Sequence, residues 1–165
     1  MPRQMISRLR NAARDDSGAT IIEMAVVVPV IMLIGLGVLE FGNFFYNYQL
    51  IQNGVRDAAR FAASMPYPPS AALPSEVQNL AVTGLPAGGT ARVAWWAPSD
   101  VSVSYSTIPN AILENGKTAY RYAGPVPVVE VSTSVPYAAL GFLGFLNITS
   151  LTVQASHQER VIGVR

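Results

Sequence analysis

The chain has 165 residues and a formal net charge of +1; half of its residues are hydrophobic, and 13% are charged against about 25% in an average soluble domain. So little charge leaves little solvated surface and favours contact with a membrane or with other chains. Cysteine is absent, which excludes a disulfide, a thiolate nucleophile and a thiolate zinc site. Nucleic acid is a poor candidate for a partner, because the basic residues are concentrated ahead of the first apolar stretch, at Arg3, Arg8, Arg10 and Arg14.

This apolar stretch predicts a membrane-spanning helix at about 19–45. No residue from Met24 to Leu39 is charged, and Glu23 and Glu40 would stand roughly 25 Å apart on a helix, close to the thickness of the hydrocarbon core. The arginines before the span place the amino terminus in the cytoplasm and the rest of a single-pass, inner-membrane protein in the periplasm. A secretory signal fits less well, because the run is longer than usual and no small-residue cleavage site follows it.

The helix is expected to continue beyond the membrane as far as Ser64. Apolar residues and alanines recur at helical spacing up to that point, and the prolines that follow forbid its continuation. Residues 65–90 are rich in proline and glycine and are predicted to form a linker, with one short helical turn around Glu76 to Leu80.

Residues 91–165 predict a small antiparallel sheet. Segments rich in valine, threonine and aromatic residues favour strands, and turn residues separate them. Trp95 and Trp96, as neighbours on a strand, would face opposite sides, one in the core and one at the surface. The whole pattern predicts an α+β fold, a lollipop in which a long amino-terminal transmembrane helix carries a β-rich periplasmic domain. The predicted strands are Arg92–Trp96, Val101–Tyr105, Val126–Val135 and Leu151–Ser156.

A glutamate near the start of the apolar run points to a function. An acidic residue costs about 2.5 to 3.5 kcal/mol at the centre of a membrane helix and less near its end. The string from Ser17 to Glu23 resembles the signal of type IV prepilins. The resemblance implies a basic leader at 1–18, cleavage after Gly18 by a prepilin peptidase, and a mature chain that begins at Ala19.

Cleavage would give Glu23 a partner. A new Ala19 ammonium and the Glu23 carboxylate, in one chain or in neighbouring chains, compensate one another among packed helices only in the correct axial register. Glu23 would therefore control register in an assembly. A carboxylate at the membrane interface explains Glu23 alone equally well, but it does not explain Gly18 and the basic leader.

The longer stretch from Ser17 to Ser64 resembles the TadE-like family of tight-adherence (Flp) pili. The resemblance rests on Glu23 to Pro29, on Glu40-Phe41-Gly42 and on Gln52 to Ala63. It implies a minor pilin or pseudopilin needed for pilus assembly and surface adherence, with no cofactor and no catalytic activity. The implied partners are prepilin peptidase, other minor and major pilins, the inner-membrane assembly platform with its secretion ATPase, and membrane lipid.

Further residues of the helix are candidates for contact with other chains. Pro29 predicts a kink, and Gly35, Gly37 and Gly42, together with Glu40, are candidates for close packing against a second helix.

The charged residues after the span allow two interpretations. Asp57 and Arg60 are spaced for a local ion pair, or Arg56, Asp57 and Arg60 contact another chain. No metal site and no catalytic motif is recognised in the sequence. The alternative function is an uncleaved single-pass membrane protein whose periplasmic domain binds a ligand.

Overall fold

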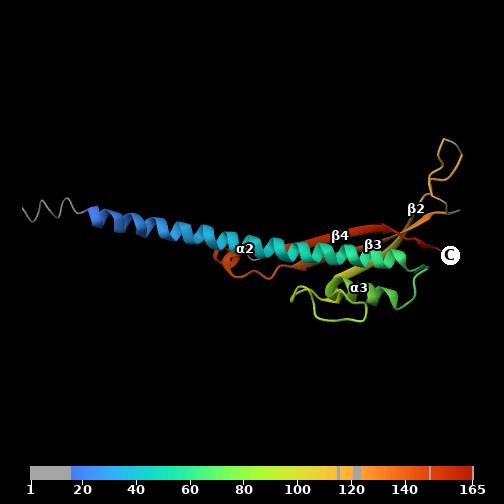
Figure 1. The fold of residues 1–165 in the computed structure, drawn as a ribbon, viewed down its shortest axis with the longest axis horizontal. Helices are drawn as coiled ribbons and strands as arrows, with labels where there is room; N and C mark the ends of the chain where they lie inside the picture. The colour runs from blue at the N-terminus through green and yellow to red at the C-terminus, as the bar shows by residue number, and fades with distance from the viewer. Residues whose placement is uncertain (1–15, 115, 121–123, 149, 165) are drawn as a thin grey trace, which may run out of the picture. The chain divides into compact units, whose positions relative to one another are not determined.

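The computed structural model describes residues 16–114, 116–120, 124–148 and 150–164. The chain divides into two compact units, one ending at Phe41 and one running from Gly42 to Arg165. A single helix, α2 (Asp16–Ser64), forms the described part of the first unit and opens the second (Figure 1). The predicted long apolar helix is confirmed, and it runs through Pro29 without ending.

In the first unit, residues 18–36 form an apolar helix whose side chains are unpacked. Every side chain from residue 18 to residue 36 is exposed, although this part of α2 has a mean hydropathy of 2.6 over its most apolar window. Among the residues that the structure describes, α2 is the one helix long and apolar enough to cross a membrane. Its length and composition are consistent with a single membrane span.

The second unit is built on a three-stranded antiparallel sheet. Strands β2 (Val101–Ile108), β3 (Val126–Pro136) and β4 (Thr152–Arg160) lie in that order, with Val101 paired to Thr133 and Ser132 paired to Ser156. All three strands were expected from the sequence, and each of them extends beyond its predicted carboxyl-terminal end, β3 by a single residue. The α+β class is therefore confirmed.

One face of this sheet packs against α2. Along β3 the valines at 129, 131 and 135 are buried, while the alternating side chains are more exposed. The buried face of α2 recurs every three or four residues and consists mainly of small side chains. It is formed by Ile51, Gly54, Val55, Ala58, Ala59 and Ala62.

The stretch at residues 65–90 contains more structure than the single helical turn expected from sequence. Helix α3 (Leu73–Thr83) begins with Pro74 in its first turn and ends at Gly84, whose φ of 83° allows the left-handed cap. Val77, Ala81 and Val82 on α3 are buried in the core that α2 and the sheet share.

The predicted strand at Arg92–Trp96 is wrong. These residues form a turn that leads into the short 3₁₀ helix η1 (Pro98–Asp100). The Arg92 amide donates to the Val82 carbonyl at the end of α3, so this segment is held by a helix rather than by a sheet edge. Of the two tryptophans, Trp96 is buried in the core as expected for one of the pair, and Trp95 is half-buried.

Two short elements complete the second unit. Strands β1 (Pro66–Tyr67) and β5 (Gly163–Val164) pair in parallel directly after α2 ends, and the Ile162 amide donates to the Ala63 carbonyl. One turn of helix, α4 (Phe142–Phe145), lies in the connection between β3 and β4.

Candidate functional site

The residues of the predicted processing site lie on the first turns of α2. Gly18, Ala19 and Glu23 are exposed, and a methyl group built at Gly18 would meet no packed atom within 4 Å. Of the predicted leader, residues 1–15 lie outside the described residues. The surface around Gly18 is open to an enzyme or to a second chain.

The predicted helix-packing residues have unequal surroundings. A methyl group built at Gly35 or at Gly42 would also meet no packed atom within 4 Å, and Gly37 is half-buried. Pro29 is exposed within the continuous helix. Small residues of this kind let a second helix approach closely. Glu40 differs from all of them, since only 1% of its surface is exposed.

The charged residues of α2 pair across the fold rather than along the helix. Both terminal nitrogens of Arg92, Nη1 and Nη2, lie 3.1 Å from Asp57 Oδ2, and Arg60 Nε lies 3.9 Å from Glu159 Oε1. Of the two interpretations of the sequence, the local pair between Asp57 and Arg60 is therefore not formed. Arg56 is exposed and has no ion pair among the described residues, so of the three it is the one most available to another chain.

Gly54 permits a close contact in the core. A methyl group built there would overlap the Ala81 carbonyl oxygen and come within 2.9 Å of the Trp96 ring. Trp96 is held in turn, because its Nε1 donates to Thr133 Oγ1 at 3.0 Å, and that hydroxyl donates to the Asp100 carbonyl at 2.8 Å. Gly54 thus sets the distance between α2, α3 and the tryptophan.

Gly54 is absent from the residues predicted from sequence, although a signal for it exists. A glycine inside a helix costs about 1 kcal/mol relative to alanine, so its presence within a regular helical pattern indicates a packing reason. What the sequence does not contain is the identity of its neighbours, because Ala81 and Trp96 are distant along the chain.

An aromatic cluster fastens the beginning of the second unit to the end of β3. Asn43 Nδ2 donates to the Tyr137 hydroxyl at 2.7 Å, and the Phe44 ring meets the Tyr137 ring edge-on at 5.2 Å. Trp95 contacts the same tyrosine from another side at 5.8 Å, and Tyr48 stacks on Phe44. Residues just beyond the apolar part of α2 are therefore in direct contact with the residue that follows β3.

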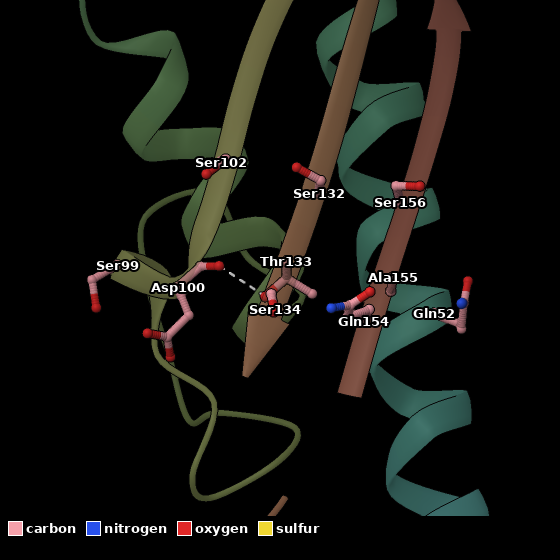
Figure 2. Close-up of a pocket in the computed structure, with 10 residues that line it drawn as sticks. All are labelled: Gln52, Ser99, Asp100, Ser102, Ser132, Thr133, Ser134, Gln154, Ala155 and Ser156. Carbon is pink, nitrogen blue, oxygen red and sulfur yellow. Dashed lines mark hydrogen bonds between the residues drawn. The ribbon is translucent and has the colours of Figure 1, made fainter. Parts of the chain in front are cut away.

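The sheet also carries an open hollow lined by hydroxyl and amide groups (Figure 2). Ser102, Ser132 and Ser156 lie side by side across the three strands, and Gln154 borders them. Asp100 is the one carboxylate in the lining, and its Oδ2 already accepts the Ala97 amide at 2.9 Å. Such a surface offers neutral hydrogen bonds to a polar ligand but no paired acid and base.

Metal ligation has no support in the part of the chain that the structure describes. No group of three or more histidine, aspartate or glutamate side chains comes together there. His157 Nε2 lies 3.1 Å from Glu159 Oε1, and this pair stands without a third ligand of those types.

Comparison with known proteins assigns the first part of the chain. A family model described as TadE-like protein matches residues 18–60, which confirms the resemblance seen in the sequence for that segment. The match begins at Gly18 and covers the exposed apolar part of α2 together with most of its packing face, but none of the sheet. No curated protein and no solved structure matches the chain significantly.

Proposed function

We propose that this chain, whose residues 18–60 form a TadE-like family domain on a pilin-like architecture, is a structural subunit of a tight-adherence (Flp) pilus system. It acts as a minor pilin or pseudopilin without catalysis, and it is needed for pilus assembly and surface adherence. One observation carries this proposal. The family match starts at Gly18, where the helix begins a long apolar surface that the rest of the described chain leaves exposed. A subunit that passes from lipid into an assembly needs such a surface.

In this proposal a prepilin peptidase cuts between Gly18 and Ala19. The chain is then held in the inner membrane by α2, with its amino terminus on the cytoplasmic side and the second unit in the periplasm. Other minor and major pilins and the assembly platform with its secretion ATPase are the proposed partners. Glu23 compensates the Ala19 ammonium and selects the axial register.

Substitution at the cleavage site tests the proposal. In cells that express a prepilin peptidase, Gly18→Leu should prevent the loss of the leader and leave membrane insertion unchanged. Gly35→Leu is the matched control, because it adds the same side chain to an equally open glycine of the same helix. Mature protein that begins at Ala19 in the Gly18→Leu variant would contradict the proposed processing.

The orientation is tested by labelling a single cysteine in a chain that otherwise has none. Ile112 is 76% exposed and lies in the connection between β2 and β3. A membrane-impermeant maleimide should label Ile112→Cys once the outer membrane is permeabilised, before the inner membrane is broken. Labelling that requires lysis of the inner membrane would contradict the periplasmic location.

The hollow on the sheet supports a second candidate, an uncleaved membrane protein whose periplasmic domain binds a polar ligand. The two candidates differ in one simple observation. A decrease in apparent mass on co-expression with prepilin peptidase favours the pilin, and an unchanged mass favours the uncleaved protein.

A further inference from the structure

The connection between β3 and β4 exposes a group of large apolar side chains. We call residues 138–148 the β3–β4 loop. Phe145 is 73% exposed and Leu140 is 67% exposed, and Leu146 and Ile148 are exposed nearby. These side chains are close together in the sequence and belong to one short loop. Such a group of exposed side chains on a folded domain indicates a contact with something apolar.

The loop is held in a defined conformation. Leu143 is buried in the core, and the Ile148 amide donates to the Leu143 carbonyl at 2.9 Å. The Tyr137 amide donates to the Leu151 carbonyl at 2.7 Å and closes the two ends of the connection. The exposed side chains are therefore already positioned, so docking would require little further loss of conformational freedom.

The loop also lies at a defined end of the second unit. Tyr137, at its start, contacts Asn43 and Phe44 at the beginning of this unit, whereas Ile162, after β4, contacts Ala63 at the end of α2. The connection projects past the ends of the two strands (Figure 1, orange). It is thus found at the end of the sheet where α2 enters the unit.

The number of residues between Ala19 and Asn43 indicates how far this end of the sheet lies from the hydrocarbon core of the membrane. A helix that enters the hydrocarbon core at Ala19 needs about 20 residues to cross its thickness of about 30 Å. Asn43 follows that point by only a few residues, so it would lie among the lipid head groups. Since Tyr137 contacts Asn43 directly, the start of the β3–β4 loop would lie at the same level.

The composition of this end fits a lipid interface. No aspartate, glutamate, lysine or arginine occurs between Glu40 and Arg56, or between Glu130 and Glu159. Phe45 is exposed within the first of these intervals, as is Tyr46. Aromatic side chains without neighbouring charges are typical of the boundary between membrane and water.

We propose that the β3–β4 loop contacts the surface of the same membrane in which α2 is anchored. The loop would form a second, interfacial attachment that holds the second unit against the bilayer until the chain is drawn into an assembly. This inference rests on the proposed membrane anchoring, but it does not depend on the processing of Gly18. Because the loop carries no charge, its contact should be insensitive to salt and to the content of anionic lipid.

A fluorescent label on the full-length chain tests this contact. Single-cysteine variants Phe145→Cys and Ile112→Cys are labelled with an environment-sensitive dye and reconstituted into vesicles of zwitterionic phospholipid. The two positions are matched, because both are apolar and about equally exposed, at 73% and 76%. They lie at opposite ends of the sheet, since β3 carries the chain from the connection that contains Ile112 to Tyr137.

The label at 145 should show a blue-shifted emission and several-fold stronger quenching by nitroxide lipids than the label at 112. Quenching by aqueous iodide should follow the opposite order. These results should persist when the protein is diluted in lipid and when anionic lipid or salt is added.

Three outcomes would overturn the proposal. Equal iodide quenching at both positions would show that the loop faces water, and protection at 145 that disappears on dilution would assign the surface to a second copy of the chain. Protection that arises only with a co-expressed pilin would assign the surface to that protein. Extraction with alkaline carbonate separates the failures, because a chain that is released contradicts the proposed anchoring itself, whereas a retained chain with a water-exposed loop contradicts only this inference.

Discussion

Both parts of helix α2 carry many apolar side chains, but the two parts use them in different ways. From residue 18 to residue 36 every side chain is exposed, although many are large. From Ile51 to Ala62 the apolar side chains are mostly small, and one face of the helix is buried against α3 and the sheet. The first part therefore has a large exposed apolar surface that packs against nothing in the described chain. The second part buries a small apolar surface against α3 and the sheet.

The segment that matches the TadE-like family model therefore contains residues of two kinds, exposed residues that the fold does not bury and residues that pack in the core. The side chains around Gly18 and Glu23 are exposed, so they are accessible to an enzyme, to lipid or to other chains. The residues around Gly54 are used by the core. Substitutions in the first part should therefore leave folding intact and affect assembly, and substitutions in the second should do the reverse.

The largest effect is expected for Glu23→Gln, which keeps size and removes charge. The variant should still insert and be cleaved, but in an assembly the Ala19 ammonium would lose its partner. Breaking one side of a buried pair costs about 3 to 5 kcal/mol, which weakens association about a hundredfold or more. Fractionation should find mature protein in the inner membrane and none in surface filaments.

Glu114→Gln is the matched control, since Glu114 is exposed in the connection between β2 and β3 and lies outside the TadE-like segment. It should assemble normally. If Glu23→Gln enters filaments as well as this control does, Glu23 is only an interfacial carboxylate.

A smaller effect, on folding stability rather than on assembly, is expected for Gly54→Ala. The added methyl group overlaps the Ala81 carbonyl oxygen, and overpacking of this kind costs about 1 to 3 kcal/mol of folding stability. Thermal unfolding of the full-length chain in detergent, followed by tryptophan fluorescence, should show a lower midpoint. Gly42→Ala is the control in the same helix, and it should be neutral or stabilising, because nothing packed lies within 4 Å. Equal midpoints for the two variants would contradict the close packing at Gly54.

Thr133→Val should destabilise the same core by a different route. It leaves the buried Trp96 Nε1 without its acceptor, and an unsatisfied buried donor costs about 1 to 3 kcal/mol. Urea unfolding should show a lower free energy of unfolding, together with a change in tryptophan emission. Ser134→Ala, at the next and exposed position of β3, should change stability by less than about 0.5 kcal/mol. A stable Thr133→Val variant would mean that packing alone holds Trp96.

The ion pair between Asp57, on the exposed side of α2, and Arg92 should contribute less to folding stability. Asp57→Asn removes the partner of Arg92, and partly exposed pairs contribute up to about 1 kcal/mol, less at high salt. The loss should shrink as salt is added, and Arg56→Gln, which breaks no ion pair among the described residues, should show neither effect. A loss independent of salt would indicate that Arg92 acts through packing.

The smallest effect, and a gain, is expected for Tyr105→Phe. The Tyr105 hydroxyl is buried and has no hydrogen-bond partner among the described residues, and burial raises the pKa of this tyrosine above its ordinary value. Because the unfolded chain then loses its proton first, the ionisation of Tyr105 leaves stability unchanged below a pH of about 10 and lowers it as the pH rises further.

The phenylalanine variant should therefore be equal or slightly more stable at neutral pH, and it should lose less stability in alkali. Tyr120→Phe serves as the control, since its ring lies under Arg160 in a partly exposed site. An alkaline unfolding curve unchanged by Tyr105→Phe would contradict the role of burial.

The long helix and the three strands could be predicted because their signals are local. A run of apolar residues, a helical period that proline ends after Ser64, and alternation along β2 and β3 each occur within one segment. The wrong strand at Arg92–Trp96 shows the limit of this reasoning. Its residues favour strands, but Arg92 is held by the end of α3 and by Asp57.

The same limit applies to the candidate site. Gly18 and Glu23 could be identified because they form a short linear pattern next to an apolar run. The role of Gly54 depends on Ala81 and Trp96, and the position of the β3–β4 loop depends on Asn43. No local pattern in the sequence brings these residues together.

The direction of the strands relative to α2 has a mechanical consequence. At one end of the second unit, Asn43 of α2 contacts Tyr137, which follows β3. At the other end, Ala63 of α2 contacts Ile162, which follows β4, so both strands lie along the helix. A pull on α2 along its axis would therefore load this interface in shear, where contacts along its whole length resist together instead of peeling apart one by one. Forced unfolding is governed by the height of the unfolding barrier. If the chain is pulled into an assembly by α2, its sheet would therefore stay attached to the helix under tension.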